Sequence, residues 1–317
     1  MGWLGAIAVL ALAGAFVGSY PAYLLEIAMI NVVAAIGLNL LTGNSGQISL
    51  CHSSFMALGA YGTALAVARI GAPFVVAVPA AAAAAALAGA GLGFPAKRLQ
   101  GIYLALATLG FLEIVQIGIE ELPDLTGGVR GLSVAKPMVF GNTRLPGYAM
   151  YLVVLAVCAF AVWTARNVAA SRVGREFDAV RLSPHAAQAL GISVGRVKLV
   201  AFALSAAYAA LAGGLLAVVV GFIDPIEFGV SATLRQITFI VVGGLGSVAG
   251  SVIGAVALSI LGELLRPVKE YADLVYTGIL LGSLLFMPRG LVTLWNRVAA
   301  RVASPGGRVS SPAGRGT

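Results

Sequence analysis

Long apolar stretches recur along almost the whole chain, and they constrain its fold more than any other feature. Crossing a bilayer takes a helix of about 20 mostly apolar residues. Of the 317 residues, 60% are hydrophobic and only 10% are charged, against about 25% charged residues in a soluble domain. The sequence therefore predicts an all-α, polytopic transmembrane bundle of about ten spans and excludes soluble and disordered classes. The candidate spans are 3–20, 22–42, 48–69, 73–95, 101–121, 148–165, 197–223, 230–243, 247–265 and 271–288.

Basic residues predict which side of the membrane each loop occupies. Most of the 20 Lys and Arg lie at 97–98, in the inner loop at 166–196 with Lys198 just after it, and from Arg289 onward. Cytoplasmic loops are enriched in such residues, so both termini are expected in the cytoplasm, and the net charge of +8 reflects topology rather than nucleic-acid binding. The first stretch lacks a basic start and is expected to be retained rather than cleaved as a signal peptide. We expect a transmembrane domain over 1–302, an outer loop at 122–147 and a disordered cytoplasmic tail at 303–317.

The sequence offers no catalytic or metal-binding pattern. It has two histidines, no Gly-Lys pair and hence no Walker A loop, and neither a G-x-S-x-G nor an H-E-x-x-H motif. No cluster of His, Cys, Asp and Glu has the spacing of metal ligands. We therefore expect no cofactor and no enzymatic activity in this chain.

Polar residues inside the predicted spans are costly in lipid and are candidates for a polar path across the membrane. They fall into three groups with helical spacing, one on each of three spans. Two interpretations remain open for them, because the same side chains could instead form hydrogen bonds that hold helices together. The candidate residues are Asn31 and Asn39, Ser49 and His52, and Glu113 and Gln116.

Small residues mark two further features. Residues 79–91 are nearly all Ala and Gly, which predicts close packing against neighbouring helices. A Gly-x-x-Gly pattern also occurs twice, at Gly43 to Gly46 and at Gly243 to Gly246, each time just before a span. Internal repeats are common in transporters, although matches by chance are frequent in a chain with 41 glycines.

The inner loop at 166–196 is predicted to contain a short helix. Ser183 is a suitable N-cap, Pro184 suits the first helical position, and Gly191 suits the turn that follows the helix. A helix of about two turns is unstable alone, so it should dock on something. The alternative is an interfacial helix lying on lipid.

This loop and several other motifs resemble one transporter family. The pattern His185-Ala186-Ala187-x-x-x-Gly191 is similar to the Glu-Ala-Ala-x-x-x-Gly coupling loop of ABC importer permeases, with His185 in place of the acidic residue. The wider pattern resembles the branched-chain amino-acid permease family, LivM subfamily. The matching segments are Gly37–Gly43, Gly46–Leu50, Gly59–Tyr61, Tyr103–Leu109, Thr126–Gly128, Lys198–Phe202, Val242–Ser247 and Met287–Leu291.

The resemblance implies one membrane subunit of an ATP-driven importer in the bacterial inner membrane. Its partners would be a sister permease, two cytoplasmic ABC ATPases and an extracytoplasmic substrate-binding protein. The cargo would be branched-chain or related amino acids, urea or short amides, translocated by alternating access. A rival hypothesis is an ion-coupled secondary transporter that uses Glu113 as a proton carrier. The residues expected to couple the chain to the ATPases are Arg175, Ser183, His185, Ala186, Ala187 and Gly191.

Overall fold

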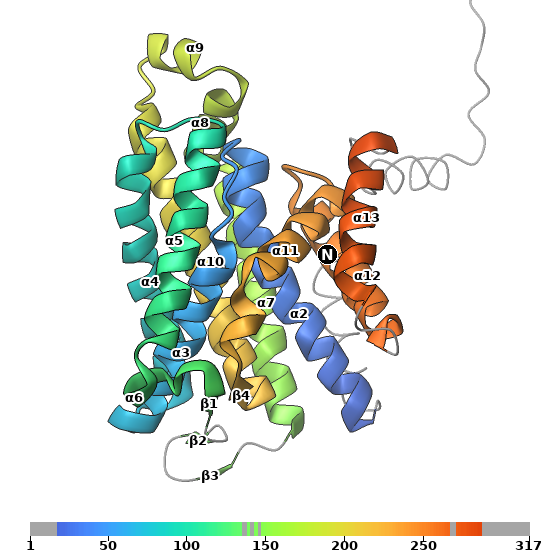
Figure 1. Ribbon diagram of the computed structural model, residues 1–317. Coiled ribbons are helices and arrows are strands. Elements are labelled where there is room, and N and C mark those ends of the chain that lie inside the picture. The colour runs from blue at the N-terminus through green and yellow to red at the C-terminus, as the bar shows by residue number, and fades with distance from the viewer. Residues whose placement is uncertain (1–17, 135–137, 140–142, 145–146, 267–270, 287–317) are drawn as a thin grey trace, which may run out of the picture.

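A computed structural model describes residues 18–134, 138–139, 143–144, 147–266 and 271–286 (Figure 1). The part of the chain it describes is a bundle of helices. Most of the predicted first span, the predicted tail at 303–317 and both termini lie outside the described residues.

The long helices account for nearly all of the bundle. Their order in the chain is α2 (Ser19–Asn39), α3 (His52–Ile70), α4 (Phe74–Ala96), α5 (Ile102–Glu120), α7 (Gly147–Ala170), α10 (Val194–Val220), α11 (Val230–Gly243), α12 (Val248–Leu264) and α13 (Ala272–Phe286). The shorter helical segments are η1 (Leu40–Asn44), α6 (Pro123–Thr126), η2 (Gly128–Arg130), α8 (Arg172–Leu182), α9 (Pro184–Ala189) and η3 (Pro225–Phe228).

Four two-residue strands form the remaining regular structure of the described residues. Strand β1 (Leu132–Ser133) pairs antiparallel with β4 (Phe222–Ile223), with Leu132 opposite Ile223. Strand β2 (Met138–Val139) pairs antiparallel with β3 (Thr143–Arg144). All four lie at one end of the bundle (Figure 1). Apart from these short pairings, the prediction of an all-α bundle is confirmed for the described residues.

Fewer spans are established than the ten predicted. Within the described residues, five helical stretches are long and apolar enough to cross a membrane: 19–44, 74–96, 102–120, 147–170 and 194–220. Helix α3 is not among them, and it begins at His52 rather than at residue 48. Its first turns carry the polar residues His52, Ser53 and Ser54, which lower its hydropathy.

The predicted spans 230–243 and 247–265 are not two independent straight helices. Helices α11 and α12 together meet the length and hydropathy of a span, but they are bent by 120° at the four residues between them, as a broken span or a re-entrant loop. Gly244 and Gly246 make this bend possible because both adopt positive φ angles, 128° and 78°, that residues with a β-carbon rarely adopt.

Helix α10 lies at the centre of the bundle and packs against α4, α3 and α2. Small residues allow these close approaches: a methyl group at Gly213 would overlap the carbonyl oxygen of Met56 in α3. On α4, Ala81, Ala82, Ala85 and Gly89 are buried. The close packing predicted from the small residues of 79–91 is therefore confirmed.

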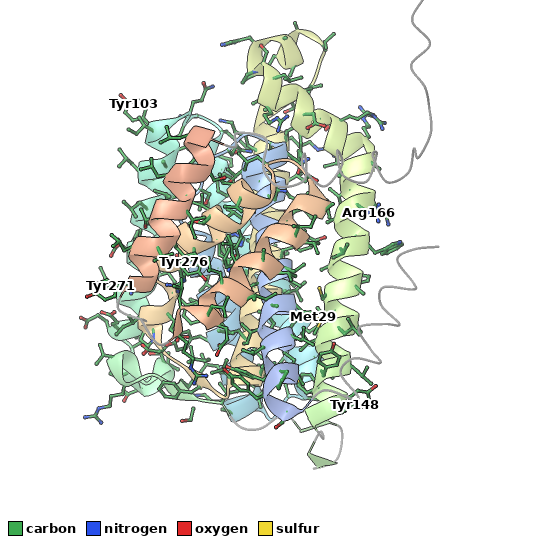
Figure 2. All side chains as sticks on the ribbon, turned by 90° about the vertical axis from the view of Figure 1, so that its right-hand side faces the viewer. Met29, Tyr103, Tyr148, Arg166, Tyr271 and Tyr276 are labelled. Atoms are coloured by element: carbon green, nitrogen blue, oxygen red, sulfur yellow. The ribbon has the colours of Figure 1, made fainter. Side chains whose placement is uncertain are left out.

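The two ends of the bundle differ in charge. Helices α8 and α9 and the connection from α4 to α5, with Lys97 and Arg98, lie at one end, whereas α6, β4 and the acidic Asp124 and Asp224 lie at the other (Figure 1). Figure 2 shows Arg166 of α7 toward the end with α8 and α9, and Tyr148 at the opposite end of the same helix.

Candidate functional site

Asn39 fixes α2 to the bend between α11 and α12. Its side chain is 2% exposed. Its Nδ2 donates to the carbonyl oxygen of Ser247 (2.9 Å) and to Oγ of Ser251 (2.7 Å), and its Oδ1 accepts from the backbone N–H of Gly246 (2.8 Å). With both ends of the amide in use, Asn39 holds helices together rather than offering polar atoms to a passing solute.

Asn31 lies two turns away on α2 and faces a cleft. Its Nδ2 donates to Oγ of Ser259 on α12 (3.0 Å), and its Oδ1 accepts from Nε2 of Gln236 on α11 (3.3 Å). These three polar residues line a cleft of about 700 Å³ between α2, α11, α12 and α13. We refer to this space as the α2–α11–α12 cleft. Its walls are mostly apolar, with Glu227, Arg235 and Glu263 also among the lining residues.

Ser49 and His52 are buried side chains of the core. Ser49 precedes α3, so the helical spacing predicted between the two residues is wrong, and its Oγ lies 3.3 Å from Sγ of Cys51. Nε2 of His52 is 2.9 Å from the carbonyl oxygen of Ala34, and Nδ1 is 3.3 Å from Oγ of Ser205. Both ring nitrogens therefore have partners on α2 and α10.

Glu113 is an exposed residue of α5. It lies beside the exposed Ile114 and Ile117, while Gln116 is half-buried near Gly229 at the start of α11. The three predicted polar groups are consequently not brought together within one chain.

Sequence reasoning missed Glu26. Its side chain is 8% exposed on α2, and it forms no hydrogen bond or ion pair with any described residue. The signal was present in the sequence, because Glu26 is the one carboxylate within the predicted span 22–42.

The short helix predicted in the inner loop is confirmed as α9. Oγ of Ser183 accepts from the backbone N–H of Ala186 (3.3 Å), Pro184 begins the helix, and Gly191 has φ +81° just after it. A preceding helix, α8, was not predicted. Its N-cap Ser171 accepts from the N–H of Val173, and Nη1 of Arg175 donates to the carbonyl oxygen of Ala170 (3.3 Å) at the end of α7.

This loop docks on its own chain through one face. Ala187 is 2% exposed and belongs to an apolar cluster with Phe177 and Val180 of α8 and Val194 and Phe202 of α10. The other face projects beyond the bundle (Figure 1). We call this projecting surface the loop apex, and its exposed residues include Leu182, His185, Ala186, Gln188 and Leu190, with the two leucines 81% and 79% exposed.

No group of three or more His, Cys, Asp or Glu residues that could hold a metal ion occurs in the described part of the chain. The candidate site therefore consists of packing surfaces, a cleft and single buried polar groups.

Comparison with known proteins assigns the chain to a family. Residues 20–286 match the family described as "Branched-chain amino acid transport system / permease component". The chain belongs to this family.

Individual relatives agree with the assignment. The LivM protein of Escherichia coli K12, named as a permease of a high-affinity branched-chain amino acid transport system, is 34% identical over 92% of this chain and 75% of its own length. The LivM protein of Salmonella typhimurium is also 34% identical, over 84% of this chain and 68% of its own. The LivH permease of Escherichia coli K12 is 27% identical over 81% of this chain and 89% of its own. No solved structure matches.

Family membership confirms two expectations drawn from the sequence. The permease is similar to the LivM proteins, as its motifs indicated, and it is a multi-pass membrane subunit of a transport system rather than an enzyme. The roles predicted for single residues in the path and in the loop stay predictions.

Proposed function

We propose that this permease is the membrane subunit of an ATP-driven ABC importer that carries branched-chain or related amino acids by alternating access. The observation that carries the proposal is the loop apex on a chain of this family. Two exposed leucines at the tip of a structured loop favour burial by a partner protein. The chain has no Walker A loop of its own, so separate ATPase subunits are the partners that this apex fits.

The expected coupling residues contribute to the apex in different ways. His185, Ala186 and Gly191 are exposed and available to a partner, whereas Ser183 caps α9 and Arg175 binds the end of α7. Ala187 is buried in its own chain, so its role is to hold α9 in place for docking.

A sister permease completes the translocation path in this proposal. Glu113 lies on an exposed, otherwise apolar face of α5, where a charge facing lipid would be costly. That face therefore favours a contact with protein or a water-filled path. Escherichia coli K12 has two different permeases, LivM and LivH, that are both similar to this chain, which supports a heterodimer.

The remaining parts of the proposal concern topology. The end that carries α8, α9, Lys97 and Arg98 would face the cytoplasm, because cytoplasmic loops are enriched in basic residues. The opposite end, with the outer loop at 122–147, would receive an extracytoplasmic binding protein. Ten spans, two cytoplasmic termini, a transmembrane domain over 1–302, a disordered tail at 303–317 and location in the bacterial inner membrane complete the proposed arrangement.

The energy source separates this function from the rival hypothesis. The assembly of both permeases, the ATPases and the binding protein is reconstituted in proteoliposomes, and leucine uptake is measured with ATP inside or with an imposed pH gradient. We expect uptake with ATP alone. Uptake that follows the pH gradient without ATP would instead establish the secondary transporter that uses Glu113.

The docking surface has its own test. Leu190→Glu places a charge on the loop apex and should abolish co-purification of the ATPases, while Asn167→Glu adds a charge at an exposed position of α7, outside the apex, as a control. Leu190→Glu should insert normally because the loop packs outside the spans. Undiminished retention of the ATPases by Leu190→Glu would exclude the apex around Leu190 as the docking surface.

A further inference from the structure

The two Gly-x-x-Gly segments, 200 residues apart in the sequence, meet in the structure. Nδ2 of Asn44 donates to the carbonyl oxygen of Gly246 (3.5 Å), and a methyl group at Gly43 would overlap the backbone nitrogen of Gly246. Only glycine permits this backbone contact. We refer to the paired segments 42–47 and 242–247 as the glycine junction.

The junction lies where three helices are interrupted. Helix α2 ends there in the π-helical turn η1 (Leu40–Asn44), and α11 and α12 are bent by 120° across its other half. Irregular turns of this kind frequently occur at functional sites. The same three helices form walls of the α2–α11–α12 cleft through Asn31, Gln236 and Ser259. A shift at the junction would therefore move walls of the cleft.

One side chain from the inner loop reaches both halves of the junction. Arg181 lies in the last turn of α8, and its Nη1 donates to the carbonyl oxygen of Gly43 (2.5 Å). A methyl group at Gly46 would lie 2.8 Å from Cγ of Arg181, and one at Gly246 would lie 3.0 Å from its Nη1. Arg181 thus packs directly on both glycine segments, and the next residue, Leu182, belongs to the loop apex.

The junction has hydrogen-bonding capacity to spare. The side-chain oxygens of Asn44 and Gln47 are buried and accept no hydrogen bond from the part of the chain that the structure describes. An Arg guanidinium has five N–H donors, and that of Arg181 donates one hydrogen bond within the described residues. Arg181 is exposed, so water can satisfy its remaining donors, whereas the two buried oxygens are acceptors that a rearranged junction could use.

We propose that Arg181 is a positioning residue that transmits movement of the α8–α9 loop to the glycine junction, and through it to the walls of the α2–α11–α12 cleft. The inference rests on the proposed function, because it takes ATPase docking at the loop apex as the source of the movement. It adds the link between that apex and the interior of the bundle.

The test compares three variants in the complete reconstituted assembly. Arg181→Ala removes the contact, Arg181→Lys keeps a cationic donor, and Arg172→Ala is a matched control. Arg172 is 86% exposed on the same helix, and its Nε forms an ion pair with Oε1 of Glu176 in α8, at 3.0 Å. A hydrogen bond from a charged group can shift an equilibrium by about tenfold or more. We therefore expect the Arg181→Ala assembly to retain its ATPases and hydrolyse ATP but to import about tenfold less leucine per ATP. Arg181→Lys should recover much of this loss. Arg172→Ala should match the wild type.

Hydrogen–deuterium exchange supplies a second readout that a purely structural role would not move. In the wild type, locking the ATPases with a non-hydrolysable ATP analogue should change exchange at both 42–47 and 242–247. In Arg181→Ala the change at 172–191 should persist while the change at the junction is lost. If Arg181→Ala does not assemble, the wild-type and Arg181→Lys measurements decide the question.

The outcomes separate the two levels of the proposal. A wild-type assembly without ATP-driven uptake would overturn the proposed function, and the inference with it. A coupled wild type with an equally coupled Arg181→Ala variant, or with no exchange difference at the junction, would overturn the role of Arg181 alone.

Discussion

Single polar residues in this bundle serve different purposes that burial and hydrogen bonding distinguish. Asn39 and His52 have both polar ends of their side chains bonded inside the core, so they hold helices together. Asn31 also forms hydrogen bonds, but it borders the cleft. Glu113 lies on the exposed side of α5. In the sequence, residue type alone could not distinguish a polar side chain that holds helices together from one that lines a path.

Replacing Asn39 should destabilise the protein. Asn39→Ala removes hydrogen bonds to Ser247, Ser251 and Gly246 and leaves the partly buried N–H of Gly246 without its acceptor. The expected loss is about 1–3 kcal/mol in the free energy of unfolding, measured by SDS titration of the purified permease. Asn167→Ala, at an exposed position of α7, is the control and should change stability little. Equal stability of the two variants would contradict the structural role of Asn39.

Replacing Glu113 tests the path. Glu113→Gln keeps the size of the side chain and removes its charge, so assembly should survive while ATP-driven uptake falls at least about tenfold, corresponding to about 1.4 kcal/mol. Glu121→Gln, just beyond the end of α5, is the matched control. Normal uptake by a fully assembled Glu113→Gln variant would remove this residue from the path.

At the scale of elements, small residues set how closely helices approach. The carbonyl of Met56 in α3 occupies the space where a side chain at position 213 of α10 would begin. By contrast, no atom lies within 4 Å of the position where a β-carbon at Gly91 of α4 would be. Substitution by alanine should therefore have opposite effects on stability at Gly213 and at Gly91.

Gly213→Ala should separate α3 from α10 and lower stability by about 1–3 kcal/mol, as overpacking typically does. Gly91→Ala should be neutral or stabilising by up to about 1 kcal/mol, because Ala favours helix more than Gly does. Thermal unfolding of the two variants in detergent compares them directly. A tolerated Gly213→Ala would show that the α3–α10 contact is looser than the structure indicates.

Local signals predicted some elements well and missed those that depend on tertiary contacts. Apolar length predicted the long helices, and Ser183, Pro184 and Gly191 predicted α9 because caps act within one turn. The 120° bend after α11 and the inward packing of Ala187 depend on contacts with distant segments, which spacing does not encode. Helix α8 could have been found from its N-cap Ser171 and the inward-facing Gly174, Phe177 and Val180.

At the scale of the whole molecule, the residues predicted to line a path do not lie together in one place. The predicted polar residues lie on different sides of the bundle, with Asn31 at the cleft and Glu113 on the outside of α5. A charge within an exposed apolar helix face is best explained by a surface that another protein covers. The exposed face of α4, in contrast, presents Val75, Val76, Leu87 and Phe94 and fits lipid.

This contrast predicts where the sister permease binds. Ile114 is 70% exposed beside Glu113. A photo-reactive benzophenone attached to the Ile114→Cys variant should crosslink to the sister permease in assembled membranes. The same probe at Leu87→Cys on α4, 76% exposed, should react with lipid instead. The native Cys51 and Cys158 are buried, so labelling should be confined to the introduced positions. Crosslinks to the sister permease from Leu87→Cys but not from Ile114→Cys would place the partner on α4. The charge of Glu113 would then have to be stabilised by water or by a counter-charge from elsewhere.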